Sequence, residues 1–595
     1  MSDVLNSPRH VANLSHHGNR MKQRHCTSSP VGLLTPVYYD ILNPGESVTI
    51  KDSVFTLTDA FNKYSLNRFT EHIDYFFVPY DMLWSLFGSF RTNVKDFHSS
   101  LFPVDPESPN ASFKFPTARF GGLTRALMSF LQDDIAEWDL YTLPNTAGSE
   151  PTLLYQDALR ILELCGIPIS DLYYFSSSIN SLQPIGAPDG FNNQPVNLHL
   201  LLAYQAIYQS WYRLTDYESF DNACFNVDVD SSEFSQGDGT IYTDHIKKII
   251  TPRFRPWKKD FFTNVLPNPT FNSNALSLFS ASQPGFNEAF RFVPTSSRST
   301  EVGDTNSPFS FDPQSPADIR QSYMFDKYLQ ITQHARKDYD SQILAHFGYR
   351  VPKDIKHGIQ YIGSHSNRIE VQGVESTAAG TTGSGSTSIL GELGSRAVGT
   401  RGQSKALKFK APCDGILMGI YSIVPESDYS ADGFDVVNLY QDWYHWYVPE
   451  FGKKGMVPFF QYEAKFSGRT AGMYEDSTQR LGWRYPYMEL KCKYDKVSGD
   501  LKRSRKSWLA QRLPFSTNRD QTGSGYLSSP ALHIAPFYTD AISLVRYNRN
   551  PSDFTWENPV QFNEDLLFAT DTFQHSFDFD IVKVTTMPPY GLQDL

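Results

Sequence analysis

Two clusters that interleave basic and aromatic residues are the segments of this sequence best suited to chemistry. One cluster contains Trp257 and the other contains Trp508. Cationic side chains neutralise phosphates and aromatic rings stack on unpaired bases, so both clusters are candidate sites for single-stranded nucleic acid. A solvated loop or a salt-bridge patch between subunits would have the same composition. The candidate residues are Arg253, Arg255, Lys258, Lys259, Lys502, Arg503, Arg505, Lys506, Trp508 and Arg512.

A third basic segment lies at the N-terminus. Residues 1–30 are polar and carry no apolar core, which is typical of a flexible arm. Their cations could hold a polyanion, or they could contact a neighbouring copy of the chain. The candidate residues of this arm are Arg20, Lys22 and Arg24.

No sequence motif indicates catalysis or a cofactor. Dinucleotide, P-loop, zinc-protease and nucleophile-elbow patterns do not occur. The run that begins at Asp228 resembles a calcium loop but has Glu233 in place of the required Gly and Gly239 in place of the closing Glu. Ser, His and Asp are plentiful, and no spacing singles out a triad, which is recognised by geometry. We therefore expect no enzymatic activity, cofactor or metal.

Strand-like patterns occur near both ends of the chain. Ser47–Thr58 and Arg68–Pro79 alternate with a period of two and carry apolar residues on both faces in their second halves. Strands that are covered on both sides have this pattern. His575–Thr586 alternates in the same way. Further strand candidates are Lys405–Pro412, Gly415–Pro425, Tyr487–Val497 and Ala531–Arg546.

The middle of the chain is predicted to be partly helical. A helix start is indicated at Ser315, which is followed by Pro316 and Asp318, and this helix is expected to continue towards His346. Apolar residues have helical spacing in three earlier segments: Leu123–Leu131, Tyr155–Cys165 and about Leu198–Leu214.

The composition indicates a folded protein with an acidic balance. The chain has 595 residues and a net charge of −11, so any contact with nucleic acid must come from local basic patches. Aromatic residues make up 14%, and they are favoured in strands and at interfaces. Five widely spaced cysteines without a CxxC pair are typical of a reducing cytoplasm. We find no secretory signal and no membrane-spanning stretch, so we expect a soluble product.

The order of these elements predicts a mainly β fold. Strands at both ends with helices and long loops between them fit a single eight-stranded jelly roll, a β-sandwich with large, partly helical loop insertions. A chain of βαβ units would instead alternate strands and helices regularly. By composition alone, Val371–Ser404 is equally consistent with a flexible linker, because it is rich in Gly, Ser, Thr and Ala.

Several segments, taken in order and spacing, match one protein family. They are Leu33–Glu46, Phe69–Pro79, Ala203–Arg213, Asp260–Pro269, Ala317–Arg320, His346–Tyr349, Gly415–Pro425, Leu481–Tyr485, Lys491–Gly499 and Thr586–Gly591. Together they resemble the major capsid protein of the small single-stranded DNA phages, the Microviridae, in particular the gokushovirus-like branch and its relatives from gut Bacteroidetes. Val371–Ser404 is similar to a loop of that family, which favours a loop within one domain over a linker.

The sequence also departs from the family pattern. Cys413-Asp414-Gly415 stands where the family often has an acidic residue, His and Gly. Leu214-Thr215-Asp216 replaces Asp-Gln-Asn, and the segment from Pro103 to Pro195 is longer and more helical than expected. These departures concern the subfamily and the outer surface.

The resemblance implies a structural role. Residues 31–595 would form one jelly-roll capsid domain behind the basic arm of residues 1–30, with insertions at about 103–195, 271–314 and 371–404. Sixty copies would assemble into a T=1 icosahedral shell around circular single-stranded DNA. The partners would be a small basic packaging protein and a DNA-pilot protein of the virion. The subunit would be made in the cytoplasm of the host bacterium and reside in the virion capsid.

A protruding loop of such a shell would meet a receptor on the host cell surface. Its candidates are the insertions at 271–314 and 103–195, and either could instead pack between subunits. Two other kinds of protein also use β-sandwiches with exposed aromatic residues. One is a carbohydrate-binding or glycan-cleaving jelly roll, which would need carboxylates facing a cleft to cleave its substrate. The other is a different virion part, such as a spike or tail adhesin.

Overall fold

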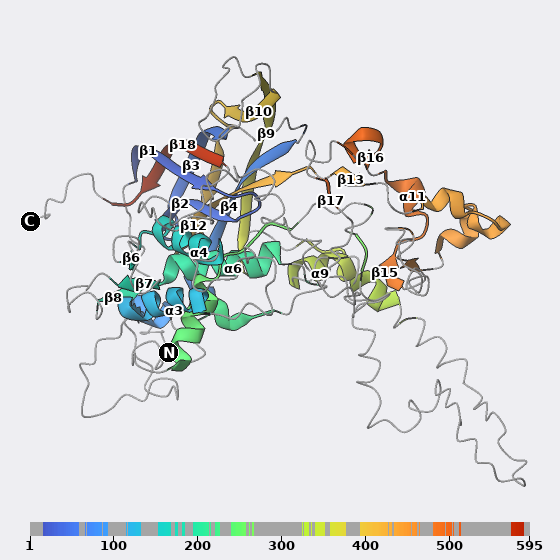
Figure 1. The fold of residues 1–595 in the computed structure, drawn as a ribbon. Coiled ribbons are helices and arrows are strands. Elements are labelled where there is room, and N and C mark those ends of the chain that lie inside the picture. The colour runs from blue at the N-terminus through green and yellow to red at the C-terminus, as the bar shows by residue number, and fades with distance from the viewer. Residues whose placement is uncertain are drawn as a thin grey trace, which may run out of the picture.

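The structure is a computed structural model. It describes residues 16–58, 66–92, 115–132, 153–184, 194–226, 240–266, 324–375, 393–463, 480–512 and 573–587, with short gaps inside several of these ranges. Within them the chain is mainly β, and its largest feature is an antiparallel, nearly closed β-sandwich. Figure 1 shows this sandwich with helices packed beneath it.

Nine of the described strands build the sandwich. In space they follow the order β1-β18-β3-β10-β9-β4-β12-β2, and the short strand β11 pairs with β3 beside β10. Every pair is antiparallel. The bounds are β1 (His17–Ser29), β2 (Thr35–Leu42), β3 (Ser47–Thr58), β4 (Phe69–Pro79), β9 (Gln360–Glu375), β10 (Leu393–Arg401), β11 (Leu407–Lys410), β12 (Gly415–Pro425) and β18 (Phe573–Thr585).

The strands predicted from alternation are confirmed for β3, β4, β11, β12 and β18, to within two residues at each end. Alternation identifies these strands because one set of side chains enters the core and the other leaves it. On β3, Val48, Ile50 and Val54 are buried, whereas Phe55 is 45% exposed.

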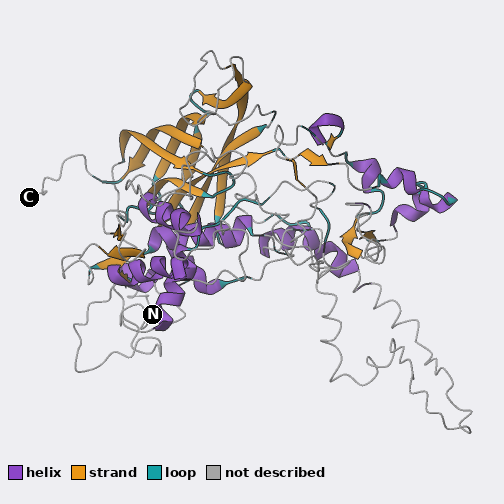
Figure 2. Ribbon diagram, viewed as in Figure 1, coloured by secondary structure: helices purple, strands orange, loops and turns teal. Residues whose placement is uncertain are grey.

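β4 separates two hydrophobic cores, as its apolar pattern on both faces predicts. Ile73, Tyr75 and Phe77 pack in the space between the two layers of strands. Phe76 and Val78, on the opposite face, pack against the helices. Figure 2 shows the result, a strand-rich part above and a helical layer below.

The helical layer follows β4 in the chain. The predicted helices are confirmed as α3 and α4 and as α6, which continues into a π-helical turn at Tyr208–Tyr212. The bounds are α1 (Tyr80–Leu83), α2 (Phe87–Thr92), α3 (Phe120–Gln132), α4 (Leu153–Leu164), α6 (His199–Ile207) and α7 (Thr240–Ile250). Small strands pair within this layer: β5 (Thr117–Arg119) with β8 (Pro195–Asn197), and β6 (Tyr173–Ser176) with β7 (Ser181–Pro184).

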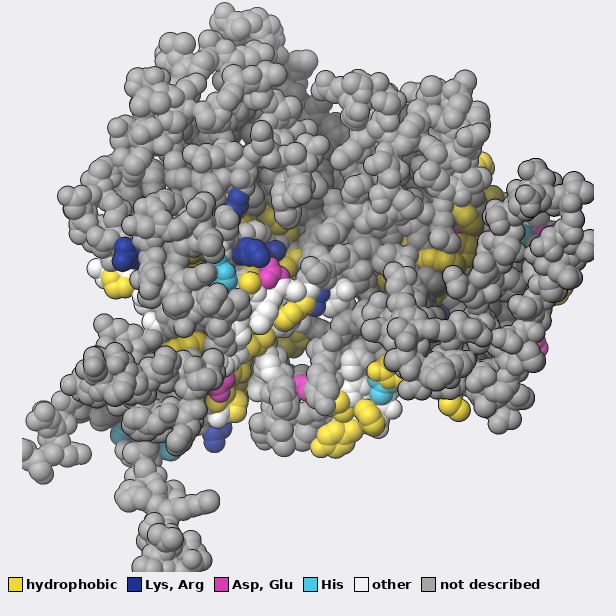
Figure 3. Space-filling view, turned by 90° about the horizontal axis from the view of Figure 1, so that it is seen from below, with side chains coloured by type: hydrophobic (Ala, Val, Ile, Leu, Met, Phe, Trp, Pro, Cys, Tyr) yellow, Lys and Arg dark blue, Asp and Glu magenta, His cyan; other side chains and the backbone are white. Residues whose placement is uncertain are grey.

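Seen from below, the molecule presents described hydrophobic side chains together with a few scattered Lys and Arg side chains (Figure 3). α6 is almost entirely buried.

The helix predicted from Ser315 to His346 is only partly observed. Its start lies outside the described residues. Residues 327–332 are helical, a bend follows at Ala335, and α9 (Tyr339–Phe347) forms a separate helix. The helical prediction is therefore confirmed for the described residues of this range, and a bend at Ala335 lies between the two helical segments.

The predicted strand Tyr487–Val497 is wrong. Tyr487 has a left-handed backbone (φ 58°) and precedes α11 (Met488–Lys491), and among the described residues of this range only β16 (Lys496–Val497) forms a strand. This segment belongs to a second large insertion, between β12 and β18. Its other described strands are β13 (Asp428–Ser430), β14 (Val457–Phe460), β15 (Arg480–Arg484) and β17 (Gln511–Arg512). The strand predicted at Ala531–Arg546 lies outside the described residues.

Three ranges of the predicted domain plan have other limits in the structure. Residues 17–29 of the supposed flexible arm are strand β1, because every residue from His17 to Ser29 pairs with β18. The ends of the insertion expected at about 371–404 are parts of β9 and β10, which pair from Leu393↔Glu375 onward. The insertion expected at 103–195 belongs to a longer one that joins β4 to β9. The insertion expected at 271–314 lies outside the described residues.

Candidate nucleic-acid interface and buried polar network

The predicted basic residues are distributed over separate parts of the structure. Arg20, Lys22 and Arg24 lie on β1, at one edge of the strand order. Arg253 and Arg255 follow α7 and contact the helical layer and β4. The structure therefore does not unite these five described residues into one site.

The cations of β1 point away from the sandwich core. Arg20 and Lys22 pair in register with Val582 and Asp580 of β18, whose even-numbered residues face outward. The Arg20 guanidinium donates two hydrogen bonds to the Asp580 carboxylate, at 3.0 and 2.8 Å. Its side chain is still 66% exposed. The hydrogen bond and charge of Arg20 lower the pKa of Asp580.

Arg255 has a structural role in the described part of the chain. Its guanidinium donates to Asp74 on β4 at 2.6 Å and to Ser422 on β12 at 3.0 Å. The guanidinium carbon of Arg255, Cζ, lies over the Tyr212 ring at 5.5 Å from its centre. The Tyr212 hydroxyl donates a hydrogen bond to Asp74 at 2.6 Å. Because Asp74 is only 3% exposed, this ion pair joins the helical layer to the sheet. The sequence-based role of Arg255 in nucleic-acid contact has no support in this geometry.

Arg253 is engaged in a similar way. It donates to the side chain of Gln205 at 2.8 Å and lies over the Tyr208 ring at 4.7 Å. Gln205 in turn donates to the carbonyl oxygens of Ile249 and Thr251. The segment after α7 is thus fastened to α6, and we assign Arg253 to this contact.

The remaining predicted residues are described only in part. Lys502 ends a short helical turn, Gly499–Lys502, and is half-buried. Arg512 lies on β17, which pairs with β13. The other candidates lie outside the described residues: Lys258, Lys259, Arg503, Arg505, Lys506 and Trp508.

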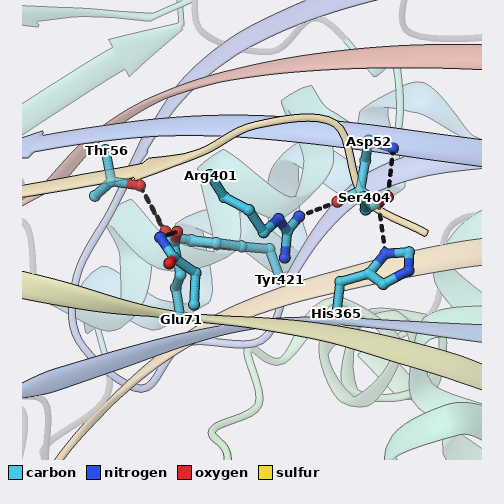
Figure 4. A network of polar contacts seen from close by, with 8 residues as sticks. Asp52, Thr56, Glu71, His365, Arg401, Ser404 and Tyr421 are labelled. Carbon is cyan, nitrogen blue, oxygen red and sulfur yellow. Dashed lines mark hydrogen bonds and ion pairs between the residues drawn. The ribbon is translucent and has the colours of Figure 1, made fainter.

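A buried polar network, which no sequence motif indicates, crosses the sandwich (Figure 4). Its first part surrounds Asp52 on β3, which is fully buried. Asp52 binds Arg401 of β10, Nδ1 of His365 on β9 at 2.5 Å and the Ser404 hydroxyl at 2.6 Å. Burial alone would raise the pKa of Asp52, but these contacts together lower it below its usual value.

The second part surrounds Glu71 on β4, which is 1% exposed. Its carboxylate accepts hydrogen bonds from Thr56 at 2.7 Å, Tyr421 at 2.9 Å and Asn367 at 2.8 Å. Four strands, β3, β12, β9 and β4, thereby meet at one carboxylate. A charge buried in this way needs such donors to offset its lost hydration.

His575 extends the network to β1. Its Nδ1 lies 3.1 Å from the Thr56 hydroxyl, and its Nε2 lies 2.8 Å from the Ser29 hydroxyl. Thr56 and Tyr421, whose hydroxyl lies 3.2 Å from Nδ1, both donate their protons to Glu71. Nδ1 of a neutral His575 must therefore donate to one of these two hydroxyl oxygens, and Nε2 must accept from Ser29. Burial lowers the pKa of His575 to about 3 and so keeps the ring neutral.

The network contains Ser, His and Asp but not the geometry of a catalytic triad. A triad needs the Ser hydroxyl bonded to the His, and the His bonded to the Asp. Ser29 contacts His575, but the other ring nitrogen of His575 faces the Thr56 hydroxyl and not a carboxylate. Ser404 and His365 both bind the same carboxylate, that of Asp52, inside the core. The arrangement can hold strands together but does not activate a nucleophile. The sequence signal was Asp52 and Thr56 on the apolar face of a predicted strand.

Other kinds of site are not found in the described part of the chain. No group of three or more His, Cys, Asp or Glu side chains there could hold a metal ion. No helix there has the length and apolar character needed to cross a bilayer. No protein-family model matches this sequence, and no curated protein is significantly similar to it.

Proposed function

We propose that this chain is the major capsid subunit of a small single-stranded DNA bacteriophage and self-assembles into a T=1 icosahedral shell around the genome. The proposal combines the resemblance of the sequence to Microviridae capsid proteins with one structural observation, the order of the strands. The subunit acts by packing against copies of itself and has no catalytic role. The proposed partners are those that the resemblance implies: the packaging protein, the DNA-pilot protein and the host receptor.

The strand order supports a jelly roll. Numbered along the chain without the short β11, the eight long strands form the nested pairs 1·8, 2·7, 3·6 and 4·5, which are β1·β18, β2·β12, β3·β10 and β4·β9. In space they read 1-8-3-6 followed by 5-4-7-2. One long hairpin rolled into two four-stranded sheets has this order. The winding also places the first and last strands side by side.

Exposed aromatic residues support assembly. Trp443 is 71% exposed, Tyr447 56% and Phe347 82%, and all three lie in the insertions and not in the sandwich. Aromatic residues are enriched at protein interfaces relative to the rest of the surface. Copies of the chain in a closed shell would bury such rings.

A glycan-cleaving enzyme is less well supported. It would need two carboxylates facing a cleft. The carboxylates that meet other polar groups inside the sandwich, Asp52 and Glu71, are buried and bound by the donors described above. No observation on the described residues favours a spike or adhesin.

Assembly of the purified full chain tests the proposal. Negative-stain electron microscopy and sedimentation should reveal uniform closed shells with about sixty times the 67.6-kDa mass of one chain. A protein that stays monomeric, with and without circular single-stranded DNA, and that binds a glycan array would contradict the capsid function.

A further inference from the structure

The outward face of β1, β18, β3 and β11 gathers cations from distant parts of the sequence. Across the strands, Lys22 lies opposite Asp580, which lies opposite Lys51. Two residues before Lys51 on β3, Thr49 lies opposite Lys408 of β11. Residues in register share a face of a sheet, so these side chains point to the same side. The cations of this face, called here the basic sheet face, are Arg20, Lys22, Arg24, Lys51, Lys408 and Lys410.

The charge on this face is not balanced within the sheet. The carboxylates in the same register are Asp578 and Asp580. Six cations against two carboxylates leave a surplus of four positive charges. Asp580 is already occupied by Arg20, and Gln403 also donates to it at 3.3 Å. A chain with a net charge of −11 thus concentrates positive charge on one sheet surface.

The four lysines of this face can contact a ligand. Lys22, Lys408 and Lys410 are exposed and Lys51 is partly exposed. Within the described part of the chain, none of the four forms an ion pair with a carboxylate. They can therefore replace the counterions of a polyanion without first breaking a salt bridge.

An aromatic ring stands on the same face. Phe55 is 45% exposed and lies between Ser576 of β18 and Thr400 of β10 in the register. Both of these neighbours are small and polar. It lies four residues from Lys51, about 13 Å along an extended strand. Phosphate-binding cations beside an exposed ring are the combination that holds single strands, because the ring stacks on an unpaired base.

We propose that the basic sheet face binds single-stranded nucleic acid. The inference rests on the proposed function and deepens it by naming the surface that meets the packaged strand. A second copy of the chain fits this surface less well, because symmetric pairing of two β1 edges would bring Arg20, Lys22 and Arg24 of both copies together. A duplex would satisfy the charges but would leave Phe55 without a base to stack on.

The test uses the full-length chain and a fluorescent 30-nucleotide oligo-dT, with affinity measured by anisotropy at several salt concentrations. The variant K22Q/K51Q/K408Q/K410Q leaves the Arg20–Asp580 pair intact. Because each phosphate contact to a single strand contributes about 0.7 to the slope of log affinity against log salt, the slope should fall by about 2 to 3. The matched control K248Q/K327Q/K491Q/K493Q removes the same charge from the insertions and should change the slope little.

Phe55→Leu separates stacking from charge. Loss of one stacked base should weaken oligo-dT binding about tenfold and leave the salt slope unchanged. Thermal unfolding of each variant checks that the fold is retained. A duplex of equal length should compete less well than the single strand, and equal competition would overturn the assignment to single strands.

The outcomes separate this inference from the capsid proposal. If the sheet variant binds oligo-dT as the wild type does, or if the wild type does not bind at all, the inference is overturned whether or not shells form. If the control loses as much affinity as the sheet variant, the site is not on this face. If the wild type forms no shells but the sheet variant loses binding, the capsid proposal fails and the binding face stands.

Discussion

At the scale of single residues, buried charges in this protein are matched by partners from remote segments. Asp74 is held by Arg255, and Asp52 is held by Arg401. Such pairs contribute less to net stability than their short distances suggest, because both charges lose hydration on burial. Removing one partner is costly, however, because the other charge then remains buried alone.

Arg255→Ala should therefore lower the free energy of unfolding by about 3 kcal/mol, since Asp74 loses its cation. Chemical denaturation followed by tryptophan fluorescence measures this. Arg24→Ala is the control, because Arg24 is exposed and bonds only to Ser576 among the described residues; we expect a change within about 0.5 kcal/mol. Equal effects of the two substitutions would show that Arg255 is not an anchor.

His575 should make the fold sensitive to moderate acid. The unfolded chain takes up a proton at this residue near pH 6.5, whereas the folded chain does so only near pH 3. Between these values the unfolded state holds more protons, so the free energy of unfolding falls as the pH falls, by up to about 1.4 kcal/mol per pH unit. Burial lowers the pKa of His72 to about 4, which adds a second contribution of the same sign.

His575→Gln should be less stable than the wild type at pH 7.5 but should lose less stability between pH 6 and pH 4.5. Part of the slope should remain, because His72 is unchanged. Thermal unfolding at a series of pH values measures this. An identical slope in both proteins would mean that His575 is already protonated in the folded chain.

At the scale of elements, the close approach of two strands requires a glycine at one position. Gly415 begins β12, and a Cβ atom there would lie 2.4 Å from the Phe77 ring and 2.7 Å from the Val78 carbonyl oxygen. The backbone contact cannot be relieved by a rotamer change. Only glycine therefore fits where β12 passes β4.

Gly415→Ala should consequently destabilise the protein by about 1 to 3 kcal/mol through overpacking. Gly18→Ala on β1 is the matched control, because nothing lies within 4 Å of its Cβ position and its backbone is not in the left-handed region. Differential scanning calorimetry compares the two. A normal melting temperature for Gly415→Ala would mean that the strands can separate at this point.

At the scale of the whole molecule, the sandwich is completed by strands from the two ends of the described chain. β1 covers the edge of β18 along its whole length. The hydroxyl of Ser29 on β1 also reaches His575 inside the core. The N-terminal segment is thus part of the fold as well as a carrier of basic residues.

Deletion of residues 1–30 should expose the edge of β18 and cause aggregation, because unpaired edges recruit other strands. Deletion of residues 1–15 alone should leave the fold intact. Size-exclusion chromatography of both proteins tests this. A soluble 1–30 deletion with an unchanged melting temperature would restore the flexible-arm interpretation.

Local sequence patterns correctly predicted several strands and helices of this protein. Alternation at Ser47–Thr58 and helical spacing at Tyr155–Cys165 identified β3 and α4, because each element must present one face to a core. The polar, basic composition of residues 17–29 hid strand β1. That strand is stabilised by its pairing with β18, which no local pattern reports.

The sequence by itself determined which residues alternate and where cations gather along the chain. Only the tertiary structure decided which cations share a surface: it buried Arg255 against Asp74 and placed Lys51 beside Lys408 on one sheet face. The physical reason is that alternation fixes the two faces of a strand, whereas the partner strand and its register depend on contacts between residues far apart in the chain.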